Sequence, residues 1–304
     1  MANFIDLDQI DILDLEYIVN LGLDLKSKKV SLNLADKNLA MIFEKSSTRT
    51  RVSFEVAINQ LKGHAIVMNQ RDMQLGKGET IADTAKVLSR YVDAVMIRSN
   101  SHKTITEFAQ NSSIPVINAL SDFSHPCQII ASLMAIKERI GDLKNKKISW
   151  FGDANNVLNS YIHACKAFGY DLRIAIPDSY DFCDEEIIKA KKNGASITKF
   201  SDAKEAAMNS DVIITDTWFS MGDVAEKDDA LRQRKIKDLQ PFQVNKILFD
   251  VASKNALFTH CLPAYRGFEV TEDVIDSERS IIFDEAENRL HAQKAILLWC
   301  FGVK

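Results

Sequence analysis

Residues 39–61 read Leu-Ala-Met-Ile-Phe, then Glu-Lys-Ser-Ser-Thr-Arg-Thr-Arg, then Val-Ser-Phe-Glu-Val-Ala-Ile-Asn-Gln-Leu. The first part is an apolar run of strand length, the second is polar, and the third carries apolar residues at helical spacing. A strand, a polar loop and a helix in this order form one βα unit. The pattern indicates an α/β protein in which polar loops follow the strands.

The same alternation continues along the chain. Short apolar runs predict strands at 39–43, 65–68, 94–97, 114–117, 147–151, 172–176, 212–215, 257–259 and 280–283. Segments of helical period lie between them, which predicts mostly parallel sheets flanked by helices. Residues 286–301 predict a closing amphipathic helix. Because no low-complexity linker interrupts the chain, we place a domain boundary near the helix expected from Pro126 to Gly141.

The composition excludes several functional classes. The 304 residues include 38 basic and 42 acidic side chains, so the net charge of -4 predicts neither a nucleic-acid nor a membrane partner. Four aspartates between Met1 and Leu15 argue against a signal peptide, and no apolar stretch is long enough to span a bilayer. Five widely spaced cysteines favour a reducing compartment and argue against a structural zinc site. We therefore expect a cytoplasmic protein without a metal.

The polar loop after the first strand suits a phosphate. Hydroxyls and Arg49 at a helix N-terminus would combine backbone N–H groups, the positive end of the helix dipole and a guanidinium. A serine N-cap followed by surface arginines is the alternative. Because Arg49 and Arg51 are two residues apart on a helix, they cannot face the same way. We assign Arg49 to the ligand and Arg51 to a structural ion pair.

A second polar cluster runs from Asp122 to Gln128 and contains Pro126, which suits the first position of a helix. His125 and Gln128 would then reach the space beyond the sheet edge, although a capping histidine and a solvated glutamine explain this cluster alone more simply. Two arginines stand at element ends: Arg98 closes the third predicted strand and Arg289 lies at the start of the last helix. Single arginines are usually solvated or paired, so each is weak evidence alone.

Three clusters in the second half of the chain also follow predicted strands. Residues 151–156 contain one glycine, and the missing GxGxxG pattern counts against NAD. Residues 216–222 could clamp a zwitterion, with the Asp216 carboxylate on an α-ammonium and polar donors on an α-carboxylate. Cys261, in the segment 260–264, would more often be a small buried hydrophobe than a reactive group. No Ser-His-Asp spacing or HExxH motif accompanies it.

In this order, the clusters resemble the aspartate and ornithine carbamoyltransferase family, and especially its ornithine branch. The motifs are Ser-Thr-Arg-Thr-Arg at 47–51, His-Pro-Cys-Gln at 125–128, Asp-Thr-Trp-Phe-Ser-Met-Gly at 216–222, His-Cys-Leu-Pro at 260–263 and Glu-Asn-Arg-Leu-His-Ala-Gln-Lys at 287–294. The resemblance implies two Rossmann-like domains, with the C-terminal helix returning to the first. Residues 1–130 and 286–304 would form the carbamoyl phosphate-binding domain, and residues 131–285 the ornithine-binding domain.

The resemblance also implies the residues of the site. It assigns carbamoyl phosphate to Ser47, Thr48, Arg49, Thr50, Gln74, Arg98, His125, Pro126, Cys127, Gln128, Cys261, Leu262 and Arg289. It assigns the ornithine backbone to Asn156, Asp216, Ser220 and Met221, and catalysis to Arg98, His125 and Cys261. Because Gln74 matches a residue that the family takes from a neighbouring subunit, a homotrimer or an assembly of trimers is expected.

The implied activity transfers the carbamoyl group of carbamoyl phosphate to the side-chain amine of L-ornithine, giving L-citrulline and phosphate in arginine metabolism. It needs no cofactor, metal or covalent intermediate: the amine attacks directly, with His125, Arg98 and Thr50 on the oxyanion. One alternative is aspartate carbamoyltransferase, which the loop 77–80 also resembles. In that case residues 232–234 could act as an aspartate clamp, although a solvated helix face is the simpler interpretation. The other alternative is a non-catalytic carbamoyl phosphate sensor.

Overall fold

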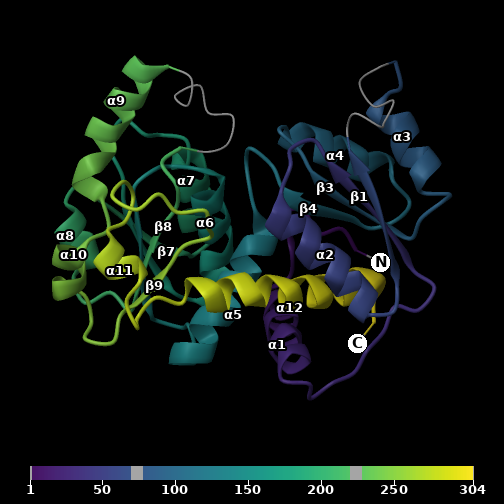
Figure 1. Ribbon diagram of the computed structural model, residues 1–304, viewed down its shortest axis with the longest axis horizontal. Helices are drawn as coiled ribbons and strands as arrows, with labels where there is room; N and C mark the ends of the chain where they lie inside the picture. Colours follow the sequence, from purple (N-terminus) through teal and green to yellow (C-terminus); the bar gives the residue numbers. More distant parts are fainter. Residues whose placement is uncertain (1, 70–77, 220–227, 304) are drawn as a thin grey trace. The chain divides into compact units, whose positions relative to one another are not determined.

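The computed structural model describes residues 2–69, 78–219 and 228–303. The chain divides into two compact units: Met1–Met134 with Glu287–Lys304 form unit 1, and Ala135–Ala286 form unit 2. Figure 1 traces the chain through both, and the chain crosses from one unit to the other inside two helices, α5 (Pro126–Ile140) and α12 (Ile282–Phe301). Within the described ranges, no helix is both long and apolar enough to cross a membrane.

Unit 1 is built on a parallel sheet that has the order β2-β1-β3-β4 within the described residues. The central strands are buried on both faces, which explains their near-continuous apolar sequences. Leu39 of the central strand lies opposite Ala65 on one side and Ala94 on the other. The strands are β1 (Asn38–Phe43), β2 (His64–Asn69), β3 (Ala94–Arg98) and β4 (Val116–Leu120).

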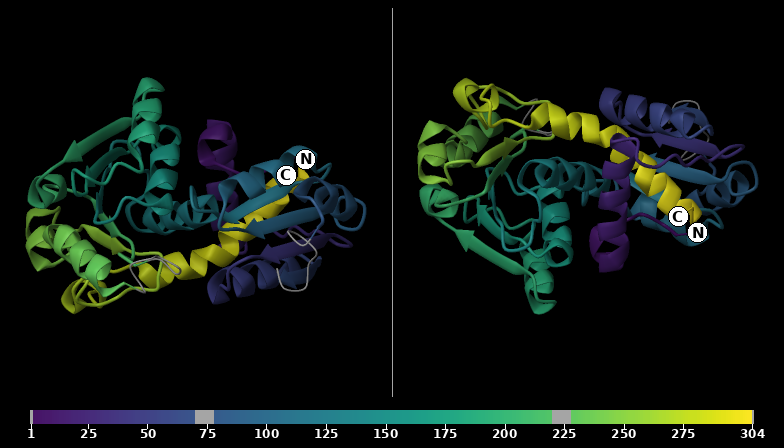
Figure 2. Two further views of the ribbon diagram at one scale, coloured as in Figure 1. Left: turned by 90° about the horizontal axis from the view of Figure 1, so that it is seen from above. Right: turned by 90° about the horizontal axis from the view of Figure 1, so that it is seen from below.

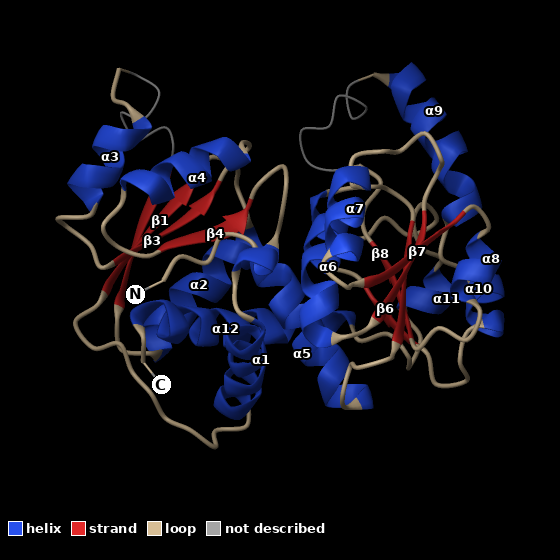
Figure 3. Cartoon of the chain, turned by 180° about the vertical axis from the view of Figure 1, so that it is seen from behind, coloured by secondary structure: helices blue, strands red, loops and turns tan. Residues whose placement is uncertain are grey.

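Helices cover both faces of this sheet. Figure 3 shows α3 and α4 on one side and α2 and α12 on the other. Ile105 and Phe108 of α4 pack with Ile42, Val95 and Ile97 of the sheet in one buried core cluster. The helices of this unit, besides its parts of α5 and α12, are η1 (Leu7–Gln9), α1 (Ile12–Lys26), α2 (Thr48–Gln60), α3 (Ile81–Leu88) and α4 (His102–Asn111).

The two ends of the chain lie side by side in unit 1 (Figure 2). The amide of Ala2 donates to the carbonyl of Cys300 over 3.1 Å, and the rings of Phe4 and Trp299 meet edge to face. Phe4 also extends the sheet, because its amide donates to the carbonyl of Val116 over 2.9 Å. The prediction that the C-terminal helix returns to the first domain is confirmed.

Unit 2 holds a second parallel sheet, with the order β7-β6-β5-β8-β9 among the residues described. In Figure 3, α6 and α7 cover one face and α8, α10 and α11 the other. The strands are β5 (Lys147–Phe151), β6 (Asp171–Ala175), β7 (Ser196–Phe200), β8 (Val212–Thr215) and β9 (Leu257–Thr259). The helices are α6 (Asn156–Phe168), α7 (Asp184–Lys192), α8 (Ala203–Ala207), α9 (Asp229–Leu239), η4 (Gln240–Phe242), α10 (Lys246–Val251) and α11 (Glu272–Ile275).

The strand order determines where each sheet can bind a ligand. The succession of strands reverses between β1 and β3 in unit 1 and between β5 and β8 in unit 2. Open parallel sheets bind ligands beyond the carboxyl ends of the strands at such a point. The polar segments 44–50 and 99–101 follow β1 and β3, and the segments 152–155 and 216–217 follow β5 and β8. The sequence-predicted clusters therefore occupy the binding edge of each sheet.

Three expectations for the strands differ from the structure. The strand expected at 280–283 is wrong: Ser280 forms one isolated bridge with Phe258, and α12 begins at Ile282, four residues before the expected start. A short apolar run is equally compatible with a strand and with a helix end. The fourth strand begins at Val116, two residues late, after Pro115, which has no N–H for the ladder. β7 escaped prediction because, of its residues, only Ile197 is buried.

Candidate functional site

The loop after β1 leads into α2 through a serine cap. Ser47 is the N-cap residue, and its hydroxyl accepts a hydrogen bond from the amide of Thr50 over 3.3 Å. The first turn of α2 contains no acidic residue, so its amides and dipole face outward without a competing carboxylate. Thr48 and Arg49 are exposed in this turn, whereas Thr50 is buried. The structure thus places the hydroxyls and Arg49 at a helix N-terminus.

Arg51 faces away from this turn and lies 3.7 Å from Glu55 one helical turn later. The structural ion pair expected for Arg51 is therefore confirmed. Both side chains are about half exposed, with relative accessibilities of 54% and 42%, so the pair contributes little to stability. Arg51 is a natural control for experiments on Arg49.

Arg289 connects three segments that are far apart in the sequence. It lies in the second turn of α12 and is buried. One guanidinium nitrogen donates to Gln128 Oε1 over 2.5 Å and another to Thr50 Oγ1 over 3.3 Å. The next residue towards the N-terminus, Asn288, accepts a hydrogen bond from Lys26 Nζ over 2.9 Å. These contacts bring the motifs 47–51, 125–128 and 287–294 together in unit 1.

His125 is surrounded by positive charge. It precedes α5, is buried, and has a pKa well below the ordinary 6.5, mainly because burial penalises its charged form. Arg289, Arg98 and Arg49 lower the pKa of His125 further through electrostatic repulsion. The imidazole is therefore neutral near pH 7, within a group of guanidinium groups that favours an anion.

Arg98 ends β3 opposite Phe43 and is buried. Its carbonyl accepts a hydrogen bond from the amide of Glu44 over 2.9 Å. The Glu44 carboxylate in turn accepts hydrogen bonds from Ser99 Oγ and the amide of Asn100, over 2.7 and 2.8 Å. Glu44 thus links the loops after β1 and β3, the two strands at the switch point.

The cysteine of the 125–128 motif has an inward-facing side chain. Cys127 Sγ donates to the carbonyl of Asn118 over 3.3 Å, and burial raises the pKa of its thiol to about 12. The thiol therefore stays protonated, and only the main chain of Cys127 is left for a ligand. Pro126 begins α5, as the sequence predicts.

In unit 2 the carboxylate of Asp216 lies between two partners. Cys261 Sγ donates to Asp216 Oδ1 over 2.9 Å, and Asn155 Nδ2 donates to Asp216 Oδ2 over 2.9 Å. Asn155 is also the N-cap of α6, where its Oδ1 accepts from the amides of Val157 and Leu158. Asn155 therefore connects the end of β5 to the loop after β8. The half-buried Asn156, which the sequence assigns to ornithine, is the first residue of α6.

His260 stabilises the turn that carries Cys261. His260 Nδ1 accepts a hydrogen bond from the amide of Leu262 over 2.8 Å, and His260 Nε2 lies 3.4 Å from the buried carboxylate of Glu269. Leu262 has a left-handed φ of 57°. Asp216, His260 and Cys261 each offer a metal-ligand atom within 4.8 Å of the others, a donor set that zinc can take. The His260 imidazole already contacts Leu262 and Glu269, and the Asp216 carboxylate already accepts a hydrogen bond from Asn155.

Six of the residues considered for the site remain to be described. Gln74, Ser220 and Met221 lie outside the described residues. The proposed aspartate clamp at 232–234 has a different arrangement: the guanidinium of Arg232 stacks over the rings of Phe219 and Phe268 at 4.6 and 5.8 Å from their centroids. The interpretation as a solvated helix face agrees with the exposed residues 233 and 234 of α9, whereas Arg232 is partly buried.

Asn155 contacts Asp216 but is not among the site residues expected from the sequence. An asparagine after an apolar strand and before a helical segment is the ordinary signal of an N-cap, and that signal was present at Asn155. Its contact with Asp216 had no signal, because the two residues are 61 positions apart in the chain.

Comparisons with known proteins agree with this arrangement. Residues 2–138 match the family model described as aspartate/ornithine carbamoyltransferase, carbamoyl-P binding domain, and residues 144–300 match the model of the Asp/Orn binding domain of the same family. The ornithine carbamoyltransferase of Rhodopseudomonas palustris strain BisA53 is 49% identical over 309 residues, which cover 99% of this chain and 97% of the relative.

Solved structures are also similar over the whole chain. The anabolic ornithine carbamoyltransferase of Campylobacter jejuni gives a TM-score of 0.90 at 40% identity, covering 100% of both chains. The ornithine carbamoyltransferase of Pyrococcus furiosus gives a TM-score of 0.89 at 45% identity, covering 98% of this chain and 96% of that one. The ordered motifs, the two doubly wound sheets and these matches agree: the chain belongs to the aspartate/ornithine carbamoyltransferase family.

Proposed function

We propose that this chain transfers the carbamoyl group of carbamoyl phosphate to the side-chain amine of L-ornithine, giving L-citrulline and phosphate. The observation that carries the proposal is the buried group in unit 1, where Arg289 holds Gln128 and Thr50 beside a neutral His125. The family match adds the reaction class, and ornithine carbamoyltransferases that are 47–50% identical to this chain add the amine.

Carbamoyl phosphate would bind at unit 1. The amides and hydroxyls of 47–50, with the Arg49 guanidinium, would hold the phosphate at the N-terminus of α2. His125, Arg98 and Thr50 would donate to the carbamoyl oxygen, while Gln128 and Arg289 complete the site. A neutral imidazole donates one N–H without adding another charge, and it cannot protonate the attacking amine as an imidazolium would. Gln74 would come from a neighbouring subunit.

Ornithine would bind at unit 2. Asn156, Asp216, Ser220 and Met221 would hold its backbone, and Cys261 and Leu262 would lie where the two substrates meet. The Asp216 carboxylate, hydrogen-bonded by Cys261, attracts an ammonium group and repels a second carboxylate. This charge would disfavour aspartate, because aspartate carries a second carboxylate that ornithine lacks.

The reaction would be a direct displacement. The ornithine amine has an ordinary pKa of about 10.4, so it must lose a proton before its lone pair attacks the carbamoyl carbon. Guanidinium groups around the bound carbamoyl phosphate would favour the neutral amine. As the new C–N bond forms, the carbonyl oxygen becomes an oxyanion beside His125 and Arg98. When this oxyanion collapses, the bond between the carbamoyl carbon and the bridging oxygen breaks and phosphate leaves. No covalent enzyme intermediate is therefore needed.

We also propose a biosynthetic role in arginine metabolism and a cytoplasmic homotrimer, or an assembly of trimers. The 40% identity to the anabolic enzyme of Campylobacter jejuni supports the biosynthetic direction. Five free cysteines support a reducing compartment. The motif around Gln74 supports the trimer. Sedimentation equilibrium of the purified chain would test the assembly, and a monomeric mass with full activity would contradict it.

The activity is tested by giving the purified protein carbamoyl phosphate with ornithine, aspartate, putrescine or N-acetylornithine in parallel. We expect citrulline from ornithine and no comparable product from the other amines. Carbamoyl aspartate instead would keep the phosphate half of the site and overturn the amine half. Tight binding of carbamoyl phosphate without any product would support the sensor alternative.

The phosphate assignment is tested by comparing Arg49→Ala with Arg51→Ala. Loss of the Arg49 guanidinium should raise the Michaelis constant for carbamoyl phosphate by about tenfold or more, the factor that corresponds to ~1.4 kcal/mol of binding. Arg51→Ala removes the same charge two residues away and should change this constant by about twofold or less. Equal effects of the two substitutions would contradict the assignment of Arg49.

A further inference from the structure

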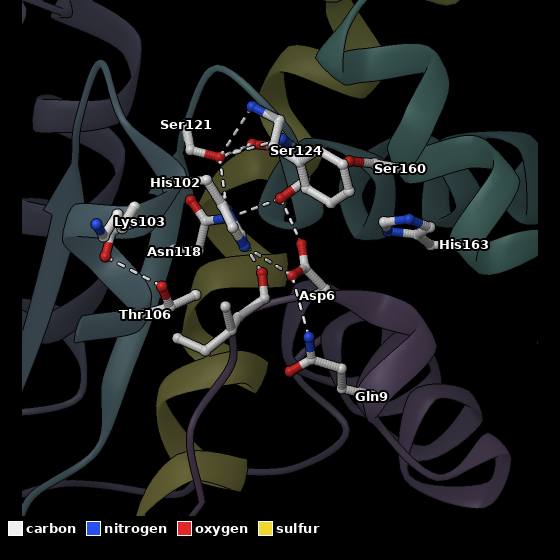
Figure 4. Close-up of polar contacts among 12 residues, drawn as sticks. Asp6, Gln9, His102, Lys103, Thr106, Asn118, Ser121, Ser124, Ser160 and His163 are labelled. Carbon is white, nitrogen blue, oxygen red and sulfur yellow. Dashed lines mark hydrogen bonds and ion pairs between the residues drawn. The ribbon is translucent and has the colours of Figure 1, made fainter. Parts of the chain in front are cut away.

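Asp6 is a buried carboxylate that the proposed reaction does not use. Its side chain is 2% exposed. Although Asp6 is the N-cap residue of η1, its side chain makes no capping hydrogen bond to that helix. Figure 4 shows its carboxylate within a network of polar side chains from the N-terminal segment and from the residues around β4.

Three side chains donate to this carboxylate. Ser124 Oγ donates to Asp6 Oδ1 over 2.5 Å, while His102 Nε2 and Gln9 Nε2 lie 3.1 and 3.2 Å from Asp6 Oδ2. Ser124 is fully buried and Gln9 is exposed. Asp6 therefore links its own segment to the turn after β4 through Ser124 and to the start of α4 through His102.

Ser121 connects the turn after β4 to His102. Ser121 Oγ accepts from the amides of Phe123 and Ser124, over 3.2 and 3.1 Å, which uses both of its lone pairs. The Ser121 hydroxyl also lies 2.9 Å from His102 Nδ1 and 3.4 Å from the carbonyl of Ser124. His102 in turn donates from Nε2 to Asp6.

Ser121, His102 and Asp6 have the residue types of a catalytic triad, but Ser121 is not a nucleophile. Ser121 is fully buried, and the two amides occupy its lone pairs. The network instead defines the tight turn 121–124, in which the amide of Ser121 also donates to the carbonyl of Ser124 over 2.9 Å. Asn118 adds a further hydrogen bond to Ser124 Oγ over 2.9 Å.

This turn is directly joined to the proposed carbamoyl site. Ser124 precedes His125, whose carbonyl accepts the amides of Gln128 and Ile129, over 3.1 and 3.4 Å, at the start of α5. A shift of the turn would therefore move the side chains of His125 and Gln128. The loop 47–50 has a local anchor of its own in the Ser47 cap, and it is joined to Gln128 through Arg289.

We propose that Asp6, acting through Ser124 and His102, is a positioning residue that holds His125 and Gln128 in place for the carbamoyl group. The proposal rests on the proposed function. It predicts a selective defect: contacts to the carbamoyl part weaken, whereas contacts to the phosphate part remain.

The test measures two ligands by titration calorimetry on the whole protein. One is inorganic phosphate, which the proposed function assigns to the 47–50 loop. The other is a stable phosphonate analogue of carbamoyl phosphate, in which a methylene replaces the bridging oxygen. For Asp6→Asn, at least one of the facing donors loses its acceptor, so the dissociation constant of the analogue should rise about tenfold while that of phosphate changes about twofold or less. Gln9→Ala removes an Asp6 partner remote from the turn and should leave both constants at wild-type values.

Ser124→Ala provides a second variant that keeps Asp6 and removes its link to the turn. It should show the same selective loss, and in both variants the Michaelis constant for carbamoyl phosphate should rise while that for ornithine at saturating carbamoyl phosphate stays constant. An equal loss for phosphate and analogue would mean a general structural role and would overturn the proposal, as would wild-type binding of the analogue. Failure of the wild-type protein to bind either ligand would instead overturn the proposed function, and this proposal with it.

Discussion

Replacing His125 with glutamine should make the protein less sensitive to mild acid. The folded-state pKa of His125 lies well below 6.5, because burial and the charges of Arg289, Arg98 and Arg49 disfavour its protonated form. The unfolded chain has no such environment, so its histidine binds a proton near pH 6.5. Above that pH both states are neutral and His125 contributes nothing to the pH dependence. Below it, only the unfolded state gains a proton, and the free energy of unfolding falls as the pH falls.

The size of this effect follows from linkage. While the folded imidazole stays neutral, a group with an unfolded pKa of 6.5 lowers the free energy of unfolding by about 0.7 kcal/mol between pH 7 and 6, and by about 1.3 kcal/mol between pH 7 and 5.5. The slope approaches about 1.4 kcal/mol per pH unit at lower pH. In His125→Gln this loss should be absent, because glutamine does not titrate.

The assay is urea unfolding of wild type and His125→Gln at several pH values from 7.5 to 5.5, without substrates. The quantity compared is the change in unfolding free energy with pH, in which all other titrating groups cancel. His64→Gln, which removes an exposed histidine of β2, is the matched control and should keep the wild-type slope. Parallel slopes for wild type and His125→Gln would refute the conclusion that His125 is held neutral by its surroundings.

The remaining predictions concern unit 2. Tyr170→Phe removes the hydrogen bond from the buried Tyr170 hydroxyl to the carbonyl of Tyr161, so we expect the free energy of unfolding to fall by about 1 kcal/mol, measured by chemical denaturation, with Michaelis constants unchanged. Asn155→Ala should cost a similar ~1 kcal/mol through loss of the α6 cap, and it should also raise the Michaelis constant for ornithine, because Asp216 loses a partner. Asn155→Asp keeps the α6 cap but places a second carboxylate beside Asp216. Its free energy of unfolding should therefore stay below that of the wild type, although aspartate caps a helix as well as asparagine does. Wild-type stability together with wild-type ornithine binding in this variant would contradict the role of Asn155.

Much of the fold was accessible from local pattern. Strands such as Lys147–Phe151 and Val212–Thr215 were predicted with their observed bounds, because burial on both faces requires a continuous apolar run. The edge strand Ser196–Phe200 was not predicted, since an edge needs few apolar residues. At residues 280–283 the short apolar run looks like a strand, but it corresponds to one isolated bridge followed by the start of a helix.

The sequence by itself determined the alternation of strands and helices, the polar loops at the strand ends and the family, because all of these are carried by residues close together in the chain. Only the tertiary structure decided which loops meet. Arg289 reaches Thr50 across 239 positions, and Asp6 reaches Ser124 across 118. Such contacts depend on the order of the strands and on the path of α12, and no local periodicity encodes either.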